Sequence, residues 1–171
     1  MSKVRIGLVG AGNIANTHMT NYQNVTDAEV VAICDIDKGK AERLAKKYGV
    51  EKFYGSIEEM IASETLDAVD VCVWNVNHAK CAIYAMEQGL HVICEKPMAY
   101  NAKEAAEMKA VSEKTGKLLM IAFVTRYADE TRVVKDYIDN GYLGDIYYAK
   151  AQYVRRHGNP GGWFADSSKS G

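Results

Sequence analysis

The fold class of this chain is decided by residues 4–15, which read V-R-I-G-L-V-G-A-G-N-I-A. The apolar run ends at Val9, and the residues after it have the spacing G-x-G-x-x-A, which predicts a buried strand that turns tightly into a helix. Gly10 permits the tight turn, Gly12 lets the backbone approach a pyrophosphate, and Ala15 lets the helix pack closely against the strand. The amides and the dipole at this helix N-terminus attract an anion. The stretch therefore predicts a nucleotide-binding turn, with a merely tight turn as the alternative.

An acidic residue strengthens this prediction. Asp35 lies 20 residues after Ala15, at the end of the second apolar run. A carboxylate there can accept hydrogen bonds from both adenosine ribose hydroxyls of NAD and would repel the 2'-phosphate of NADP. The structural alternative is that Asp35 caps the helix that begins near Asp37. We expect NAD as the cofactor, with NADP less favoured, and the first residues expected to bind it are Gly10, Gly12, Asn13, Ile14 and Asp35.

Strand and helix patterns alternate along the first two thirds of the chain. Apolar runs suited to parallel strands covered on both faces occur at Val4–Val9, Glu29–Cys34, Ala68–Trp74, His91–Cys94 and Leu118–Phe123. Helical patterns lie between them at Asp37–Tyr48, Ser56 to about Ser63, Ala79–Gln88 and Asn101–Thr115. Ser56 and Glu59 have the spacing of a capping box. We predict an α/β fold, a Rossmann-type doubly wound parallel sheet of six strands, five of which are these runs.

The pattern changes after Phe123. A helix is predicted over Asp129–Asn140, and Asp145–Val154 alternates apolar and polar residues as a strand of an antiparallel sheet does. We therefore predict an NAD-binding Rossmann domain at residues 1–123, followed at residues 124–171 by the start of an α+β substrate and dimerisation domain that is cut short.

Two tyrosines bear on assembly. Tyr147 and Tyr153 fall on one face of the predicted strand Asp145–Val154 and would need another sheet or subunit to cover them. We therefore expect a homo-oligomer formed through the second domain. The residues from Arg155 to Gly171 read as a loop.

Length and composition narrow the function classes. The chain has 171 residues, about one domain with a little left over, and its 21 basic and 22 acidic residues give a net charge of -1. Without a charge excess, we expect neither a nucleic acid nor a membrane as a partner. The apolar runs are far shorter than the ~20 residues of a membrane span, and a signal-peptide pattern is missing. We expect a cytoplasmic protein.

The tripeptide Glu95-Lys96-Pro97 follows the run that ends at Cys94. Pro97 disfavours helical dihedrals at Lys96, so this lysine should project at the carboxyl end of the sheet, where ligands of this fold bind. An ammonium group there can polarise a substrate hydroxyl or carbonyl and carry a proton. The alternative is a solvated lysine at a strand end.

Together these motifs resemble the glucose-fructose oxidoreductase, inositol dehydrogenase and MocA (Gfo/Idh/MocA) family of nicotinamide-dependent oxidoreductases. The resemblance covers essentially the whole chain and rests on G-x-G-x-x-A at 10–15, Asp35, G-x-H-V-x-x-E-K-P at 89–97, Arg126-Tyr127 and G-x-x-G at 141–144. The E-K-P after G-x-H-V is its specific part. It implies an oxidoreductase that transfers hydride between NAD and a sugar, polyol or related hydroxyl compound, with Lys96 as the catalytic proton carrier.

The resemblance assigns further residues to the cofactor site. It implies that Asn75, Glu95 and Lys96 border the cofactor and that Arg126 faces the nicotinamide end of the cleft. Trp163 resembles part of a family segment that folds back over the cofactor, with an apolar anchor of the loop as the alternative. His78 matches the last residue of the family's T-P-N-x-x-H motif, but Val and Trp replace Thr and Pro in this chain, V-W-N-V-N-H at 73–78. A plain helix-start residue is the alternative for His78.

The resemblance also implies a downstream D-x-G-x-H segment whose Asp and His assist the lysine, and residues 1–171 contain no such segment. We therefore expect this chain to be an amino-terminal portion that is inactive alone. A redox-cycling glycosidase of the same family and a non-catalytic NAD-binding sensor module stand as alternatives. A methyltransferase is disfavoured, because Leu8-Val9 lack the acidic residue that often precedes that family's glycine turn.

The sequence predicts no metal site. Four histidines show no ligand spacing: His18, His78, His91 and His157. Four cysteines match neither a C-x-x-C pair nor a zinc spacing: Cys34, Cys72, Cys81 and Cys94. We expect these cysteines to be reduced and structural.

Overall fold

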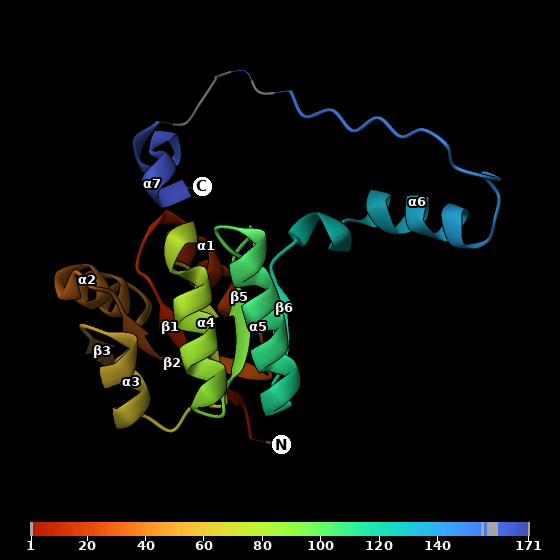
Figure 1. Ribbon diagram of the computed structural model, residues 1–171. Coiled ribbons are helices and arrows are strands. Elements are labelled where there is room, and N and C mark those ends of the chain that lie inside the picture. Colours follow the sequence, from red (N-terminus) through yellow and green to blue (C-terminus); the bar gives the residue numbers. More distant parts are fainter. Residues whose placement is uncertain (1, 155, 157–160, 171) are drawn as a thin grey trace.

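The computed structural model describes residues 2–154, 156 and 161–170. Its main body is a six-stranded parallel sheet with the order β3-β2-β1-β4-β5-β6 (Figure 1). The strands are β1 (Val4–Val9), β2 (Ala28–Cys34), β3 (Lys52–Tyr54), β4 (Ala68–Val71), β5 (His91–Cys94) and β6 (Leu119–Ile121). The predicted doubly wound sheet is confirmed, and β3 is the strand that none of the five apolar runs indicates.

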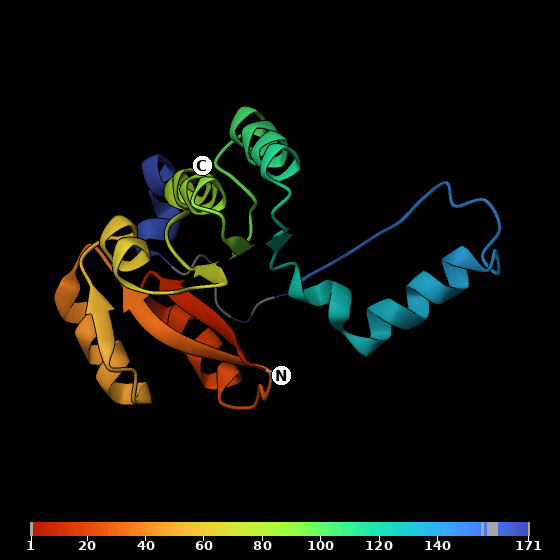
Figure 2. The same cartoon turned by 90° about the horizontal axis from the view of Figure 1, so that it is seen from below.

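Helices cover both faces of the sheet (Figure 2). On one face, α1 (Asn13–Tyr22) and α2 (Lys38–Tyr48) pack around Leu8 and Ile33. On the other face, α3 (Ile57–Ser63), α4 (His78–Glu87) and α5 (Ala102–Thr115) pack around Val69 and Val92. Burial of consecutive strand residues on both faces explains why the strands read as continuous apolar runs.

Helix ends follow the predicted cap residues to within one position. Asp37 accepts a hydrogen bond from the Lys40 amide at the start of α2, and Asn101 accepts one from Glu104 at the start of α5. The capping box is half right, because Ser56 Oγ accepts from the Glu59 amide at 3.0 Å but Glu59 accepts from the amide of Gly55.

Two strands, β4 and β6, are shorter than predicted. β4 stops at Val71 instead of Trp74. A short 3₁₀ helix, η1 (Asn75–Asn77), then leads to α4. β6 covers only Leu119–Ile121. Single backbone bonds continue just beyond both strands, because the Cys72 amide donates to the Val9 carbonyl at 2.7 Å and the Ala122 amide donates to the Cys94 carbonyl at 2.8 Å. The paired register itself ends at Val71 and Ile121.

The chain leaves the sheet after β6. η2 (Val124–Tyr127) leads into α6 (Asp129–Asp139), which projects away from the body, and an extended stretch returns toward η3 (Gly162–Ala165) and α7 (Ser167–Ser170) (Figure 1). The strand predicted at residues 145–154 is wrong, because this stretch belongs to no sheet among the described residues. Alternating apolar residues form a strand only where a second strand supplies hydrogen-bond partners. Arg155, His157 and the loop positions 158–160 lie outside the described residues.

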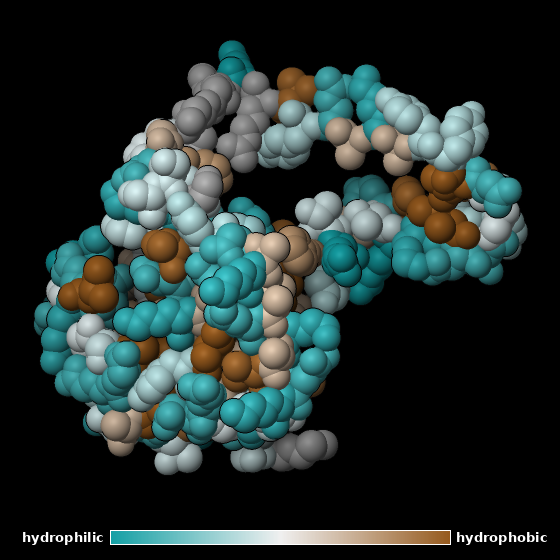
Figure 3. Space-filling model, in the orientation of Figure 1, coloured by the Kyte–Doolittle hydropathy of each residue, from teal (hydrophilic) through white to brown (hydrophobic). Residues whose placement is uncertain are grey.

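The projecting α6 has no buried residue. Val133 and Val134 are 57% and 54% exposed, and Tyr137 and Ile138 are also exposed. Figure 3 shows apolar surface gathered toward the far end of this arm. Exposed apolar side chains gathered on one helix face are typical of a contact surface.

The cysteines agree with the structural role expected of them. All four are free, and Cys34, Cys72 and Cys94 are buried. Burial raises the pKa of the Cys72 thiol to about 12 and that of Cys81 to about 11, so both stay protonated near neutral pH. Within the described residues, none of the helices has the length and apolar character needed to cross a bilayer.

Candidate functional site

The register of the parallel strands brings their carboxyl ends to one edge of the sheet. Val9 pairs with Cys34 in β2 and with Val71 in β4, and Val71 pairs with Cys94 in β5. The connections that follow these four strands therefore meet at this edge, which is where ligands bind in doubly wound sheets. Most of the residues predicted to form the site lie on these connections.

The glycine turn has the geometry that the sequence predicts. Gly10 has a φ of 99°, and a Cβ there would lie 2.6 Å from the carbonyl oxygen of Cys72. Gly12 begins α1 without a side-chain cap, and a Cβ there would meet nothing within 4 Å. Asn13 and Ile14, in the first turn of α1, are exposed. The helix N-terminus thus presents free amides to an open surface, as an anion site requires.

Asp35 fastens this turn to the end of β2. Its Oδ2 accepts a hydrogen bond from the Ala11 amide at 2.8 Å, and its Oδ1 accepts one from the Asp37 amide at 2.8 Å. The alternative role of Asp35 as the cap of α2 is wrong, since Asp37 is the cap. Each carboxylate oxygen has a second lone pair, so Asp35 can still accept from ribose hydroxyls.

An open groove of about 450 Å³ runs beside the glycine turn, between α1 and α2. Its cationic residues are Lys40, Arg43 and Lys47. A second hollow, of about 260 Å³, lies at the opposite edge of the sheet near Lys3 and Gly49 and contains none of the predicted site residues. The groove at the glycine turn is therefore the hollow that coincides with the predicted site.

Lys96 projects at the carboxyl edge, as predicted. Its side chain is exposed, its backbone amide donates to Glu95 Oε2 at 3.1 Å, and its bond to Pro97 is cis. Glu95 itself is only 7% exposed. Its buried carboxylate holds the turn from which Lys96 extends.

His78 and Asn75 make contacts within the protein. His78 is buried, and its ring nitrogens lie 2.7 Å from the carbonyl oxygen of Pro97 and 3.1 Å from that of Val73. These contacts engage both nitrogens and favour the structural alternative for His78. Asn75 Nδ2 donates to the carbonyl of Ser170 at 2.7 Å.

The segment that contains Trp163 folds back onto the carboxyl edge. Besides the bond to Asn75, Tyr100 donates to the carbonyl of Ser167 at 2.9 Å and Lys169 Nζ lies 5.2 Å from the Trp74 ring centre. Figure 1 shows α7 beyond this edge, and Figure 2 shows it on the face of the sheet that α4 covers. Trp163 is partly buried and its ring packs on Phe164, with the ring centres 5.1 Å apart.

Arg126 lies apart from these groups. It follows β6 in η2, its side chain is exposed, and its guanidinium lies 5.6 Å from the centre of the Phe123 ring. The structure places Arg126 at the carboxyl edge but joins it to none of the other predicted residues by a described contact.

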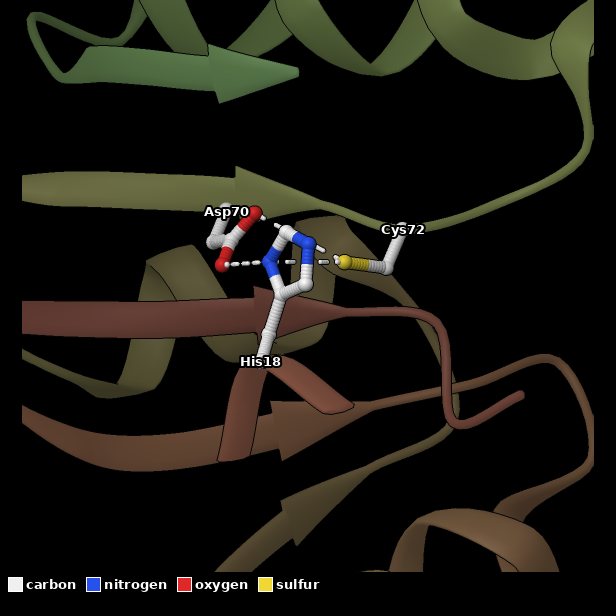
Figure 4. A group of neighbouring side chains, drawn as sticks. All are labelled: His18, Asp70 and Cys72. Carbon is white, nitrogen blue, oxygen red and sulfur yellow. Dashed lines mark hydrogen bonds and ion pairs between the residues drawn. The ribbon is translucent and has the colours of Figure 1, made fainter. Parts of the chain in front are cut away.

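A buried ionic cluster that the sequence did not indicate lies behind the site (Figure 4). His18 Nδ1 lies 2.7 Å from Asp70 Oδ2, and His18 Nε2 lies 3.0 Å from Glu95 Oε1. Tyr22 also donates to Asp70 Oδ2, at 3.0 Å. A signal existed, because Asp70 interrupts the apolar run 68–74 and a buried carboxylate needs a partner. Nothing in the sequence identified His18 as that partner.

The cluster is an ion pair in charge and geometry. Carboxylates only accept hydrogen bonds, so both ring nitrogens of His18 must donate, which requires an imidazolium. Its hydrogen bond to Asp70, supported by contacts with Cys72 and Glu95, raises the His18 pKa to about 12. Burial alone would raise the pKa of Glu95, but hydrogen bonds from His18 and from the Lys96 amide hold it below its ordinary value.

Ligand atoms of His18, Asp70 and Cys72 lie within 4.8 Å of one another, which is a spacing that a metal ion could bridge. Both ring nitrogens already contact carboxylate oxygens, however, at 2.7 and 3.0 Å. We therefore interpret this group as an ion-pair cluster.

The imidazolium predicts a loss of stability at mildly alkaline pH. A pKa raised from 6.5 means that the stabilisation is complete below pH 6.5 and declines as the pH rises from there toward 12. The free energy of unfolding should fall by about 2 kcal/mol between pH 6.5 and 8.5. Urea unfolding at both pH values measures it, with His18→Gln as the control that should lose most of this dependence. Equal pH dependence in the two proteins would rule out a buried imidazolium.

Comparison with known proteins gives a family match over the sheet and its helices. Residues 4–123 match the GFO_IDH_MocA family model, described as "Oxidoreductase family, NAD-binding Rossmann fold". D-glucoside 3-dehydrogenase of Escherichia coli (strain K12) is 37% identical over 161 residues, which are 94% of this chain and 46% of that protein.

Solved structures that resemble this chain include dehydrogenases as well. Myo-inositol 2-dehydrogenase from Lactobacillus plantarum has a TM-score of 0.78 and 31% identity, over 85% of this chain and 43% of the other. The WlbA dehydrogenase from Bordetella pertussis, solved with NADH and UDP-GlcNAcA, has a TM-score of 0.79 and 31% identity, over 85% of this chain and 45% of the other. The chain thus spans somewhat less than half the length of these relatives.

Proposed function

This chain belongs to the Gfo/Idh/MocA family of oxidoreductases, and from that membership we propose that it is the NAD-binding part of a dehydrogenase acting on a sugar, polyol or related hydroxyl compound. The observation that carries the proposal is the meeting of the open Gly12 turn, Asp35 and Lys96 at one edge of the sheet. A relative of 37% identity is a glucoside dehydrogenase, and a solved relative contains NADH.

The residues present fit a dinucleotide. The space beside Gly12, which a Cβ would partly occupy, is open, and the first amides of α1 have no side-chain cap. Gly12, Asn13 and Ile14 would hold the pyrophosphate, and Asp35 would accept from the ribose hydroxyls. When bound, NAD supplies the acceptor for the substrate hydride.

The other residues at the edge have separate roles in this proposal. Lys96 Nζ would move the proton of the substrate hydroxyl, since its side chain is exposed where the nicotinamide half would lie. Glu95 and Asn75 border that half, and Asn75 also anchors the segment with Trp163. That segment would exclude water from the cofactor, and Arg126 would face the nicotinamide end.

We further propose that residues 1–123 form the NAD-binding domain and that residues 124–171 begin a second domain through which the protein associates. The exposed face of α6 supports this division.

Light scattering should show particles larger than one chain, and Val134→Glu should shift them toward the monomer because a charge on an apolar interface is costly. Glu130→Lys is the control for a charge change on the same helix. A monomer at every concentration would contradict the assembly proposal.

NAD should bind more tightly than NADP. Asp35 repels a 2'-phosphate, while Lys40 and Arg43 in the adjacent groove reduce the difference. We expect a preference for NAD of at least about tenfold, or ~1.4 kcal/mol, by calorimetric titration. Asp35→Asn should lower that preference, whereas Asp37→Asn, which removes a neighbouring charge of the same sign, should retain it. Equal or tighter binding of NADP to the unaltered chain would overturn the assignment of NAD.

A further inference from the structure

The ionic cluster reaches the catalytic edge through a continuous chain of hydrogen bonds. Tyr22 donates to Asp70 at 3.0 Å, His18 joins Asp70 to Glu95 Oε1 at 2.7 and 3.0 Å, and Glu95 Oε2 accepts from the Lys96 amide at 3.1 Å. These hydrogen bonds connect α1, β4 and the turn after β5.

We propose that His18 is a positioning residue for Lys96, holding the Glu95 carboxylate between its ring and the Lys96 amide. This inference rests on the proposed function for the catalytic role of Lys96, but the link itself is a property of this chain. His18 does not touch Lys96 in any described contact, and it acts through Glu95.

Burial strengthens the hydrogen bonds that join Asp70, His18 and Glu95. Asp70 is fully buried, Glu95 is 7% exposed, and the His18 side chain is 15% exposed. Two buried carboxylates need a cation that can donate to both, and the imidazolium does so from opposite sides of one rigid ring. Without His18, Glu95 would be a buried charge without its strongest partner and would turn toward water or toward a cation.

The location of His18 on α1 gives the link a second consequence. The N-terminus of α1 forms the glycine turn, so one helix both presents amides to the pyrophosphate and fixes the turn that carries Lys96. Asp70 is fully buried in β4 and also accepts a hydrogen bond from Tyr22, so it holds His18 in place against the sheet. The cofactor-binding side and the proton-transferring side of the edge are thereby held in one relative position.

Three variants separate the link from general stability. In His18→Asn, the shorter amide can reach Asp70 but not Glu95. In His18→Gln, the longer amide can reach the position of Nε2 and donate to Glu95, although without a charge. Tyr22→Phe is the matched control, because it removes a hydrogen bond to the same Asp70 oxygen without touching Glu95.

Nuclear magnetic resonance of the ¹⁵N- and ¹³C-labelled chain gives the readouts. We expect the Lys96 amide to exchange about tenfold faster in His18→Asn, with an intermediate rate in His18→Gln and an unchanged rate in Tyr22→Phe. The Glu95 carboxyl should titrate at a higher pKa in His18→Asn and at the unaltered pKa in Tyr22→Phe. Core amides of β4 and β5 should keep their exchange rates.

Two results would overturn the proposal. One is an unchanged Lys96 exchange rate and Glu95 titration in His18→Asn. The other is equal acceleration of Lys96 and the β4 and β5 amides, which would make His18 a general stabiliser. Failure of the proposed function has a different signature, since addition of NADH to the unaltered chain would then leave the Lys96 amide signal unmoved whatever the His18 variants show.

Discussion

We expect Lys96→Ala to lower the turnover of the catalytically complete protein by about 10²- to 10⁴-fold, which is the contribution expected of a positioned proton carrier. The fold should lose only about 0.5 kcal/mol or less, because the Lys96 side chain is exposed and the hydrogen bond to Glu95 comes from its backbone. NAD affinity should change far less than turnover, since the expected phosphate and ribose contacts come from Gly12, Asn13 and Asp35.

The measurements are steady-state turnover, NAD affinity and melting temperature, each compared with Lys80→Ala. Lys80 is an exposed lysine on α4 and should be replaceable without loss of turnover. Near-normal turnover in Lys96→Ala would remove this lysine from the mechanism. A large drop in its melting temperature would instead support a structural role.

Alanine at the two glycines of the turn should have different effects. At Gly10 it should reduce stability, and at Gly12 it should weaken NAD binding. Gly10→Ala places a Cβ 2.6 Å from the Cys72 carbonyl oxygen at a φ of 99°, so we expect a loss of about 2–4 kcal/mol in the free energy of unfolding. Gly12→Ala meets nothing within 4 Å in the protein, so it should fold normally. Its methyl group would lie where the pyrophosphate must approach and should weaken NAD binding by at least about tenfold.

Urea unfolding and calorimetric titration of both variants check this pair. Normal NAD affinity in a folded Gly12→Ala chain would mean that the cofactor does not approach this turn. An unchanged stability in Gly10→Ala would mean that β1 and β4 are not held as closely as the structure shows.

The fold could be predicted from sequence where the physics is local. Consecutive apolar residues such as Leu8-Val9 and Ile33-Cys34 identify strands covered on both faces, and Gly49 and Gly116 identify helix ends. The strand predicted at 145–154 failed because strand formation depends on a partner strand elsewhere in space. β3 is three residues long, too short for a periodic signal.

The candidate site divides in the same way. The spacing of Gly10, Gly12 and Asp35 along the sequence is enough to predict a nucleotide-binding turn, and the structure places these residues together. Arg126 and Trp163 instead pack on their neighbours Phe123 and Phe164. The His18, Asp70 and Glu95 cluster could not be found from spacing, because His18 is 52 residues from Asp70 and 77 from Glu95 in the sequence and meets them only when α1 packs on the sheet.

Titration of NAD into the ¹⁵N-labelled chain shows whether NAD binds at the carboxyl edge of this sheet. We expect the amide signals of Gly12, Asn13 and Lys96 to shift in a saturable manner, while those of Lys3 and Gly49, beside the hollow at the opposite edge, stay in place. Absence of any saturable shift, or shifts confined to the opposite edge, would contradict binding at the carboxyl edge.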